Sequence, residues 1–138
     1  MTDITRRGFL ELSLPVLASV GGLSTACGAS VPTHAVAAGP LAALPPGPQR
    51  MDGYDVFLIR TDEGVAAISG QCTHAGCGVQ VAGDSFHCGC HGSDFAADGT
   101  VTNGPAERDL AWYAVRIEDG EVVVDPTEIV PKGTFTPY

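Results

Sequence analysis

Cys72-Thr-His-Ala-Gly-Cys77 and Cys88-Gly-Cys-His-Gly-Ser-Asp-Phe95 are the two stretches that decide how this chain folds. Together with the residues between them, they hold four of the chain's five cysteines and three of its four histidines. Thiols and imidazoles at this density cross-link the chain as disulfides, bind a metal, or do both. The sequence around the two stretches indicates how they are brought together.

Short runs rich in Val and Ile surround the two stretches and alternate with turn residues, which predicts strands and hairpins. Eighteen glycines and ten prolines favour the same turn-rich, all-β architecture. The strands are expected at residues 54–60, 65–68, 78–81, 85–87, 100–102, 111–117 and 121–124. The first two, the next two and the last two of these would pair as hairpins.

The length and charge of the chain limit what it can do. At 138 residues with 44% hydrophobic content, it has room for one domain with a small core. The formal net charge is −9 with only seven Lys and Arg residues, and phosphate binding needs a basic face, so nucleic acid is not an expected partner. An acidic surface suits a basic patch on a protein partner instead.

The hairpin predicted at residues 78–87 joins the two cysteine stretches and would bring them side by side. Four ligands could then converge from two loops, namely the thiols and imidazoles of Cys72, His74, Cys88 and His91. The remaining two thiols would be neighbours, and neighbouring thiols outside the cytoplasm normally oxidise to a disulfide.

Two simpler interpretations use the same residues. A structural zinc site of the Cys₂His₂ kind has suitable ligands, but it would leave the second pair of cysteines and Ser93 without a role. A domain held together by disulfides alone would leave His74 and His91 without a role. His87 is expected to point away from the site, because neighbouring residues of a strand face opposite sides.

The pairing of Cys72-Thr-His-x-Gly-Cys77 with Cys88-x-Cys-His-Gly-Ser93 resembles the Rieske [2Fe–2S] proteins of quinol-oxidising cytochrome complexes. Residues 99–106 are similar to the third loop of that family, which carries Gly-Pro and covers the cluster. The resemblance extends over about residues 50–125. It implies stacked antiparallel sheets, with a cluster-binding lobe at about residues 71–106 on a β-sandwich base.

The resemblance also implies one [2Fe–2S] cluster per chain and a ligand set for it. Cys72 and Cys88 would bind one iron as thiolates, and His74 and His91 would bind the other iron through ring nitrogens. Imidazoles are neutral, so they remove net negative charge from the centre and make its reduction easier. Exposed histidines would also couple reduction to proton uptake at their outer ring nitrogens.

Four further residues beside the ligands have expected effects under the same resemblance. Cys77 and Cys90 would form a disulfide that ties the two loops together. Ser93 would donate a hydrogen bond toward the cluster and so raise its potential. High-potential members of the family have a second hydroxyl donor, a tyrosine, where this chain has Phe95. The potential is therefore expected in the upper part of the range of roughly −150 to +300 mV, below that of members with both donors.

Residues 1–38 are of a different kind and are expected to be a leader followed by a linker. Thr5-Arg-Arg-Gly-Phe-Leu10 resembles the twin-arginine export signal and precedes a moderately apolar stretch at residues 12–23. Pro15 and Gly21-Gly22 interrupt that stretch, which disfavours a membrane-spanning helix of about 20 apolar residues. A retained N-terminal anchor is the alternative, and it would also place the domain outside the cytoplasm.

Two cleavage sites compete at the end of this leader. Leu23-Ser-Thr-Ala-Cys27 resembles a lipoprotein box, in which Cys27 would be lipidated, and Ala35-Val-Ala37 is an ordinary small-residue site. Cys27 is the odd cysteine of the five, which favours lipidation, because secreted proteins seldom keep a lone thiol. Residues 29–48 read as a linker and entry segment, and residues 39–138 as the Rieske domain.

Electron transfer is the expected function, with no substrate chemistry of the chain's own. The donor and acceptor would be protein redox partners in an extracytoplasmic or membrane-associated oxidoreductase, either a quinol–cytochrome complex or a molybdenum oxidase of the arsenite-oxidising type. A free-standing periplasmic lipoprotein carrier is the alternative. A Rieske ferredoxin that serves an oxygenase fits less well, because the export signal and the paired thiols point away from the cytoplasm.

Overall fold

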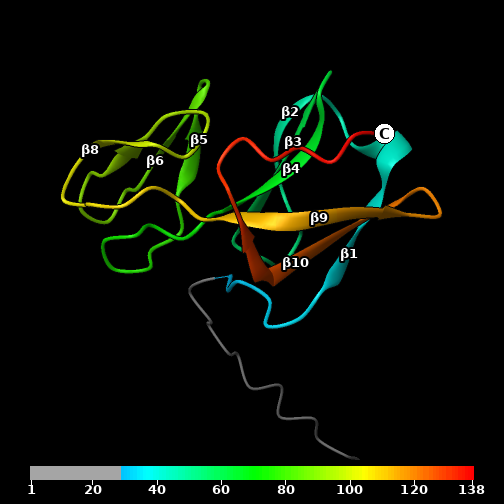
Figure 1. Cartoon of the computed structure of the whole chain (residues 1–138). Coiled ribbons are helices and arrows are strands. Elements are labelled where there is room, and N and C mark those ends of the chain that lie inside the picture. The colour runs from blue at the N-terminus through cyan, green and yellow to red at the C-terminus, as the bar shows by residue number, and fades with distance from the viewer. Residues whose placement is uncertain (1–28) are drawn as a thin grey trace, which may run out of the picture.

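The computed structural model of the chain describes residues 29–138. Within that range the regular structure consists of ten strands and one 3₁₀ turn, Leu41–Ala43, so the all-β prediction is confirmed. Figure 1 shows the strands in two groups, a large base sheet and a smaller lobe beside it. The twin-arginine motif, the apolar stretch and Cys27 lie outside the described residues.

The base is one antiparallel sheet of six strands in the order β1-β10-β9-β4-β3-β2. It is a single curled sheet with the small lobe beside it, and the predicted fold of antiparallel sheets with a small separate lobe is confirmed. Its strands are β1 (Val36–Pro40), β2 (Gly47–Arg50), β3 (Val56–Thr61), β4 (Gly64–Ser69), β9 (Trp112–Glu118) and β10 (Glu121–Val130).

The hairpin of β3 and β4 is the centre of the molecule, because both of its faces are buried. Successive strand residues point to opposite faces, so Val56 and Leu58 join one hydrophobic core while Phe57 joins another. In β4, Val65 and Ala67 lie in the first core, and Ala66 and Ile68 lie in the second. This double burial explains why the sequence of the hairpin is apolar without alternation.

The two cores have different partners. The first lies inside the curl of the base sheet, where Tyr113, Val122 and Val124 of β9 and β10 pack against the central hairpin. The second lies between the base sheet and the small lobe, and it contains Cys72 and Cys88, the two cysteines of residues 29–138 that have no disulfide partner. The second core therefore joins the cysteine loops to the base.

The hairpin of β9 and β10 turns at Asp119 and Gly120, as predicted. Both residues have positive φ, 50° and 79°, which suits a tight turn with a right-handed twist. The prediction ended the second strand at residue 124, but β10 continues to Val130 through a register shift between Asp125 and Ile129. Pro126 lies in this irregular part, where a missing N–H group is tolerated.

The prediction that residues 29–48 form a linker and entry segment is wrong for two segments, which form strands. β1 pairs with β10 along Val36–Pro40, and β2 pairs with β3 from Gly47 onward. These strands are the two edges of the base sheet, where the Pro and Gly residues that resemble a linker are tolerated. β1 runs through the predicted domain boundary between residues 38 and 39.

The small lobe is an antiparallel sheet of four short strands in the order β5-β6-β7-β8. The predicted hairpin that joins the cysteine stretches is present, with Val81 opposite Phe86. The prediction missed β7, which pairs Phe95 with Phe86 and folds the second cysteine stretch back on the hairpin. The strands are β5 (Gln80–Ala82), β6 (Ser85–His87), β7 (Asp94–Phe95) and β8 (Val101–Asn103).

The chain after β10 forms a C-terminal tail, residues 131–138, that contacts both the base and the small lobe. Thr136 exchanges two backbone hydrogen bonds with Val65 of β4, at 2.8 and 2.9 Å. The Phe135 ring meets the Trp112 indole edge to face, with ring centres 5.6 Å apart. Lys132 Nζ donates to Thr100 Oγ1 at 2.6 Å and to Asp109 Oδ2 at 2.8 Å.

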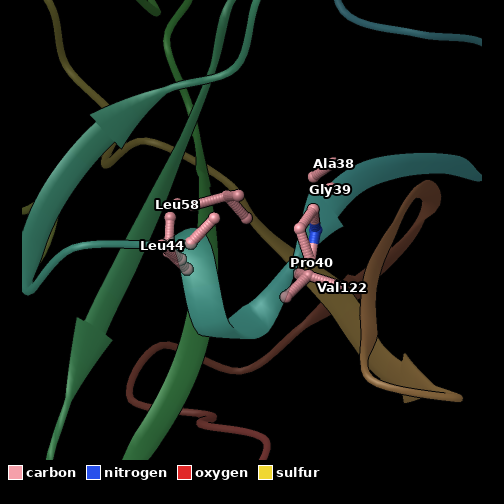
Figure 2. A pocket seen from close by; sticks show the side chains of 7 residues that line it. Ala38, Gly39, Pro40, Leu44, Leu58 and Val122 are labelled. Carbon is pink, nitrogen blue, oxygen red and sulfur yellow. The ribbon is translucent and has the colours of Figure 1, made fainter.

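A small apolar hollow of about 110 Å³ lies in the base, between the N-terminal segment and the sheet (Figure 2). The hollow adjoins the first hydrophobic core and is not beside the cysteine loops. Its lining residues are Ala38, Gly39, Pro40, Ala43, Leu44, Leu58 and Val122. In residues 29–138, the structure contains no helix that is long and apolar enough to cross a membrane.

Candidate metal centre

Two loops of the same construction carry the cysteines, loop 1 (residues 72–77) and loop 2 (residues 88–93). In loop 1 the N–H of Cys72 donates to the carbonyl of Cys77 at 2.7 Å, and in loop 2 the N–H of Cys88 donates to the carbonyl of Ser93 at 2.8 Å. Each loop thus folds back onto its first cysteine.

A glycine at the same position of each loop makes this folding possible. Gly76 and Gly92 have φ of 79° and 81°, a left-handed conformation that other residues adopt with difficulty. Their N–H groups donate to the carbonyls of Cys72 and Cys88, at 2.9 and 3.0 Å. The glycines are visible in the sequence, and the repeated spacing from the first cysteine is the signal that could have predicted equivalent loops.

The first cysteine of each loop is buried. Cys72 and Cys88 are 3% and 1% exposed, and neither is in a disulfide. Burial raises the pKa of the Cys88 thiol, and the adjacent Cys72 thiol raises it further, while N–H groups of Cys90 and His91 lower it. The two thiols thus lie together in an apolar setting, and backbone N–H groups point at one of the sulfurs.

The histidines of the two loops lie at the surface and face each other. The His74 and His91 rings have centres 4.7 Å apart and are nearly perpendicular, at 87°. Both residues are exposed. The two loops therefore present two buried thiols and, nearer to solvent, two imidazoles.

A disulfide joins Cys77 of loop 1 to Cys90 of loop 2, as the resemblance implied. Its Cα atoms are 6.5 Å apart, within the usual range for a disulfide. The sulfurs of Cys77, Cys88 and Cys90 all lie within 4.8 Å of one another. The cross-link therefore lies directly beside a buried thiol of the candidate site.

Loop 3, defined here as residues 101–109, holds both cysteine loops from one side. The Thr73 hydroxyl donates to the carbonyl of Arg108 at 2.6 Å, which ties loop 3 to loop 1. The side-chain amide of Asn103 donates to the carbonyl of Gly92 at 3.2 Å, which ties loop 3 to loop 2. These two contacts could not be predicted from the sequence, because Thr and Asn are ordinary loop residues.

Ser93 is fully buried at the end of loop 2, with 0% of its surface exposed. Its Oγ accepts a hydrogen bond from the N–H of Ala106 in loop 3, at 3.0 Å. Phe95 is buried two residues later in the second core, so its ring supports the lobe but offers no hydroxyl.

The other two described histidines lie apart from this pair. His87 is exposed on β6, and its Nδ1 lies 2.6 Å from Asp94 Oδ1. This hydrogen bond from His87 holds the pKa of the Asp94 carboxyl below its usual range. His34 is exposed near the start of the described chain. His87 thus belongs to an exposed polar contact between β6 and β7.

Two open hollows flank His74. One of about 410 Å³ is lined by residues of loop 1, including Cys72, together with Arg108 and Asp109. The other, about 500 Å³, is lined by Thr73, His74, Pro105, Glu107 and Arg108. The imidazole of His74 is therefore reachable from outside on two sides.

The donor set fits an iron–sulfur centre with mixed ligation. Soft thiolate sulfurs select iron–sulfur clusters, and imidazoles on a second iron are the distinguishing feature of one cluster type. Of the cysteines in residues 29–138, the two free thiols are together in the interior and the other two form a disulfide, while the two imidazoles are together at the surface. A structural zinc site would not explain this separation into a buried and an exposed pair of ligands.

Comparison with known proteins gives the same assignment. The model of the Rieske [2Fe-2S] domain matches residues 34–114, more than half of the chain. The cytochrome b6-f complex iron-sulfur subunit of Chlorobaculum tepidum is 32% identical, over 88% of this chain and 76% of that protein. The chloroplastic cytochrome b6-f complex iron-sulfur subunit 1 of Nicotiana tabacum is 38% identical, over 59% of this chain and 40% of that protein.

The fold has solved counterparts as well. A chain in the complex of reduced oxygenase and oxidized ferredoxin in carbazole 1,9a-dioxygenase is similar with a TM-score of 0.51 and 21% identity, over 73% of this chain and 100% of that chain. This likeness concerns the fold alone. The family match and the Chlorobaculum relative include both cysteine loops, and this chain belongs to the family of Rieske [2Fe–2S] domain proteins.

Proposed function

We propose that this chain is the electron-transferring iron–sulfur subunit of a membrane-associated quinol–cytochrome complex outside the cytoplasm. The observation that carries the proposal is the paired arrangement of buried thiols and exposed imidazoles across two loops joined by a disulfide. Similarity to a cytochrome b6-f iron-sulfur subunit over most of the chain supports a cytochrome complex over an oxygenase or a molybdenum enzyme.

The proposed ligands are Cys72 and Cys88 for one iron and His74 and His91 for the other. The bound [2Fe–2S] cluster supplies a site that accepts and releases one electron. The buried cysteines hold its inner side in a setting from which water is excluded. The exposed histidines hold its outer side, where an outer ring nitrogen can bind or release a proton at the surface.

The partner is proposed to dock on the face that carries the histidines. Loops 1 and 2 contain no Asp, Glu, Lys or Arg, although the chain has a formal charge of −9. Partner contacts to loops 1 and 2 themselves would then be made by neutral groups, whereas the hollows beside His74 also offer the charged side chains of Glu107, Arg108 and Asp109. Close approach of the partner to the imidazoles is supported by the open hollows on both sides of His74.

The proposal places residues 1–38 in the role of leader and attachment. Export by the twin-arginine route, lipidation of Cys27 and membrane association remain predictions from the sequence. Mass spectrometry of the mature N-terminus would distinguish lipidated Cys27 from cleavage after Ala37. Replacement of Arg6 and Arg7 by Lys should stop export if the twin-arginine route is used.

The cluster can be tested directly on the full chain purified after export. We expect acid-labile sulfide and iron in equal amounts, the EPR signal of a reduced Rieske centre, and a midpoint potential in the upper part of the range of roughly −150 to +300 mV. Oxidation of a quinol by the chain with a b-type cytochrome would support the complex. Bound zinc without acid-labile sulfide would overturn the proposal.

A further inference from the structure

We infer that the backbone N–H of Ala106 fixes the direction in which the Ser93 hydroxyl donates its hydrogen bond, and that loop 3 thereby sets the potential of the centre. Ala106 is in this sense a positioning residue. The inference rests on the proposed function, because it concerns the tuning of the bound cluster. In this inference the backbone of loop 3 affects the reduction potential of the cluster, in addition to covering the site.

The starting observation is a buried hydrogen bond between loops 2 and 3. The N–H of Ala106 lies 3.0 Å from Ser93 Oγ, and the two residues are 5% and 0% exposed. An amide N–H can only donate, so the serine oxygen accepts this bond with one of its two lone pairs. The hydroxyl hydrogen of Ser93 must then point away from Ala106.

That hydrogen needs an acceptor, because a buried hydroxyl that donates to nothing destabilises the fold. Among residues 29–138, the hydrogen bonds of Ser93 Oγ comprise only the one it accepts from Ala106. Ser93 ends loop 2, and its own carbonyl is bonded to the N–H of Cys88, a proposed ligand. Sulfur of the proposed centre is the acceptor that the site would supply.

The Ala106 amide is suited to this task because loop 3 is held on both sides of it. Before it, Asn103 donates to the carbonyl of Gly92 in loop 2. After it, the carbonyl of Arg108 accepts from Thr73 in loop 1, and Asp109 Oδ1 accepts from the N–H of Val101 at 3.0 Å. These bonds fix the amide relative to both cysteine loops.

The consequence follows from the angular dependence of hydrogen bonds. A serine hydroxyl rotates freely about its Cβ–Oγ bond unless a partner fixes it, and a hydrogen bond weakens steeply when its angle departs from linear. A donor that is held toward the centre stabilises the reduced state, which is more negative, and raises the potential. Loss of the Ala106 N–H should therefore lower the potential even though Ser93 is unchanged.

The test removes this one N–H group by replacing Ala106 with its α-hydroxy acid analogue, which turns the amide into an ester. Ala106→Pro is the genetic version, and the ester keeps the test valid if the proline variant does not fold. Midpoint potentials are measured for the cluster-loaded full chain, for the ester, for Ser93→Ala, and for the two changes combined. The matched control is an ester at Glu107, whose N–H makes no hydrogen bond within residues 29–138.

We expect the ester at Ala106 to shift the potential downward by no more than Ser93→Ala does, with the EPR signal retained. The combined variant should have the potential of Ser93→Ala alone, and the control ester should leave the potential unchanged. Equal shifts by the Ala106 ester with and without Ser93 would overturn the inference, as would no shift at all. Absence of a cluster signal in the wild-type chain would instead overturn the proposed function, and this inference with it.

Discussion

The cysteines and histidines of the two loops meet different surroundings although they are close in sequence. Cys72 and Cys88 are buried, whereas His74 and His91 are exposed with their rings 4.7 Å apart. Thiols in a dry interior are protected from oxidants and from exchange with solvent. Imidazoles at the surface can instead be reached by a partner or a proton donor. Single substitutions at the two kinds of position should therefore have different effects.

His91→Ala is expected to abolish the EPR signal of the cluster, because the proposed outer iron would lose one of its two imidazoles. His87→Ala is the matched control, since His87 is also exposed, lies in the same lobe and contacts Asp94 instead of the other loop. The control should keep the signal and the bound iron. A normal EPR signal in His91→Ala would show that the ligand assignment is wrong.

Most of the candidate site could be predicted at the scale of residues. Cys72, His74, Cys88 and His91 stand out because two short stretches each combine Cys and His at close spacing, and the structure brings these residues to two neighbouring loops. The contact of Asn103 with loop 2 could not be predicted. Its effect depends on tertiary placement and on a backbone carbonyl that every residue has.

At the scale of elements, the disulfide connects two loops that also share a β-hairpin. Cys77→Ser is expected to leave a cluster that forms but is lost more readily, because the four proposed ligands are on the joined loops and not on the disulfide itself. The cross-link closes a loop between residues separated by 13 positions. A loop of this length contributes about 3 kcal/mol by restricting the unfolded chain.

Loss of cluster absorbance during incubation with a chelator measures this lability, and Cys90→Ser should match Cys77→Ser. Two variants with different behaviour would mean that the freed thiol, rather than the missing cross-link, is responsible. A wild-type rate of cluster loss in both variants would contradict a bracing role for the disulfide.

The C-terminal tail depends on one glycine at the start of β4, Gly64. Gly64 has φ of 138°, and a Cβ at this position would overlap the carbonyl oxygen of Thr136. Gly64→Ala should therefore displace the tail and destabilise the fold by more than the backbone strain alone, which is about 1–3 kcal/mol. Gly83→Ala is the matched control, because Gly83 also has positive φ, 66°, but open space beside it.

Urea unfolding of the two variants gives the comparison. The control should lose only the backbone strain of a left-handed residue, about 1–2 kcal/mol, and Gly64→Ala should lose clearly more. Equal losses would show that the contact between the turn and Thr136 does not hold the tail.

At this scale, strands could be predicted where the local sequence had a clear pattern of apolar runs and turn residues. The hairpins at β3–β4, β5–β6 and β9–β10 were predicted correctly, because apolar runs flank turns that contain Gly and Asp. The edge strands β1 and β2 were missed, because their Gly and Pro residues look like a linker and only pairing with β10 and β3 makes them strands.

At the scale of the whole molecule, a charged network at Lys132 joins the tail to the small lobe. Lys132 is the only lysine of the chain, and its Nζ contacts Asp109 and Thr100, with Asp98 4.0 Å away. The bond from Lys132 lowers the pKa of Asp109, and the Asp109 carboxylate raises the pKa of Lys132. A bond from the Thr100 hydroxyl is the main cause of the lowered pKa of Asp98.

The pKa shifts set the direction of the pH dependence. A carboxyl group whose folded pKa is lowered stabilises the fold above its unfolded pKa, about 3.9, and this contribution is lost as the pH falls through the folded value. A lysine whose folded pKa is raised contributes below its unfolded pKa, about 10.4, and loses the contribution as the pH rises through the folded value. The network should therefore be intact from about pH 5 to 9.

Thermal unfolding across pH should show this directly. We expect the Tm of the wild type to decrease at pH values below about 4. Lys132→Met should have a lower Tm at pH 7, and its Tm should depend less on acid pH. Arg116→Met is the matched control, because Arg116 pairs with Glu118 and Asp125 within the base sheet and does not connect the tail to the small lobe. If Arg116→Met lowered the Tm as much as Lys132→Met does, the Lys132 network between the tail and the small lobe would have no special role in stability.

The single tryptophan of the chain lies at this same junction. The indole of Trp112 donates to the carbonyl of Asp98 at 2.8 Å, and its ring meets Phe135 of the tail. Loss of the tail from the base would remove Phe135 and expose the indole to solvent, whereas Trp112 is only 3% exposed in the folded chain. Trp112 is thus an intrinsic fluorophore at the contact between the base sheet and the tail. Detachment of the tail can therefore be followed by the emission wavelength of the protein without any added label.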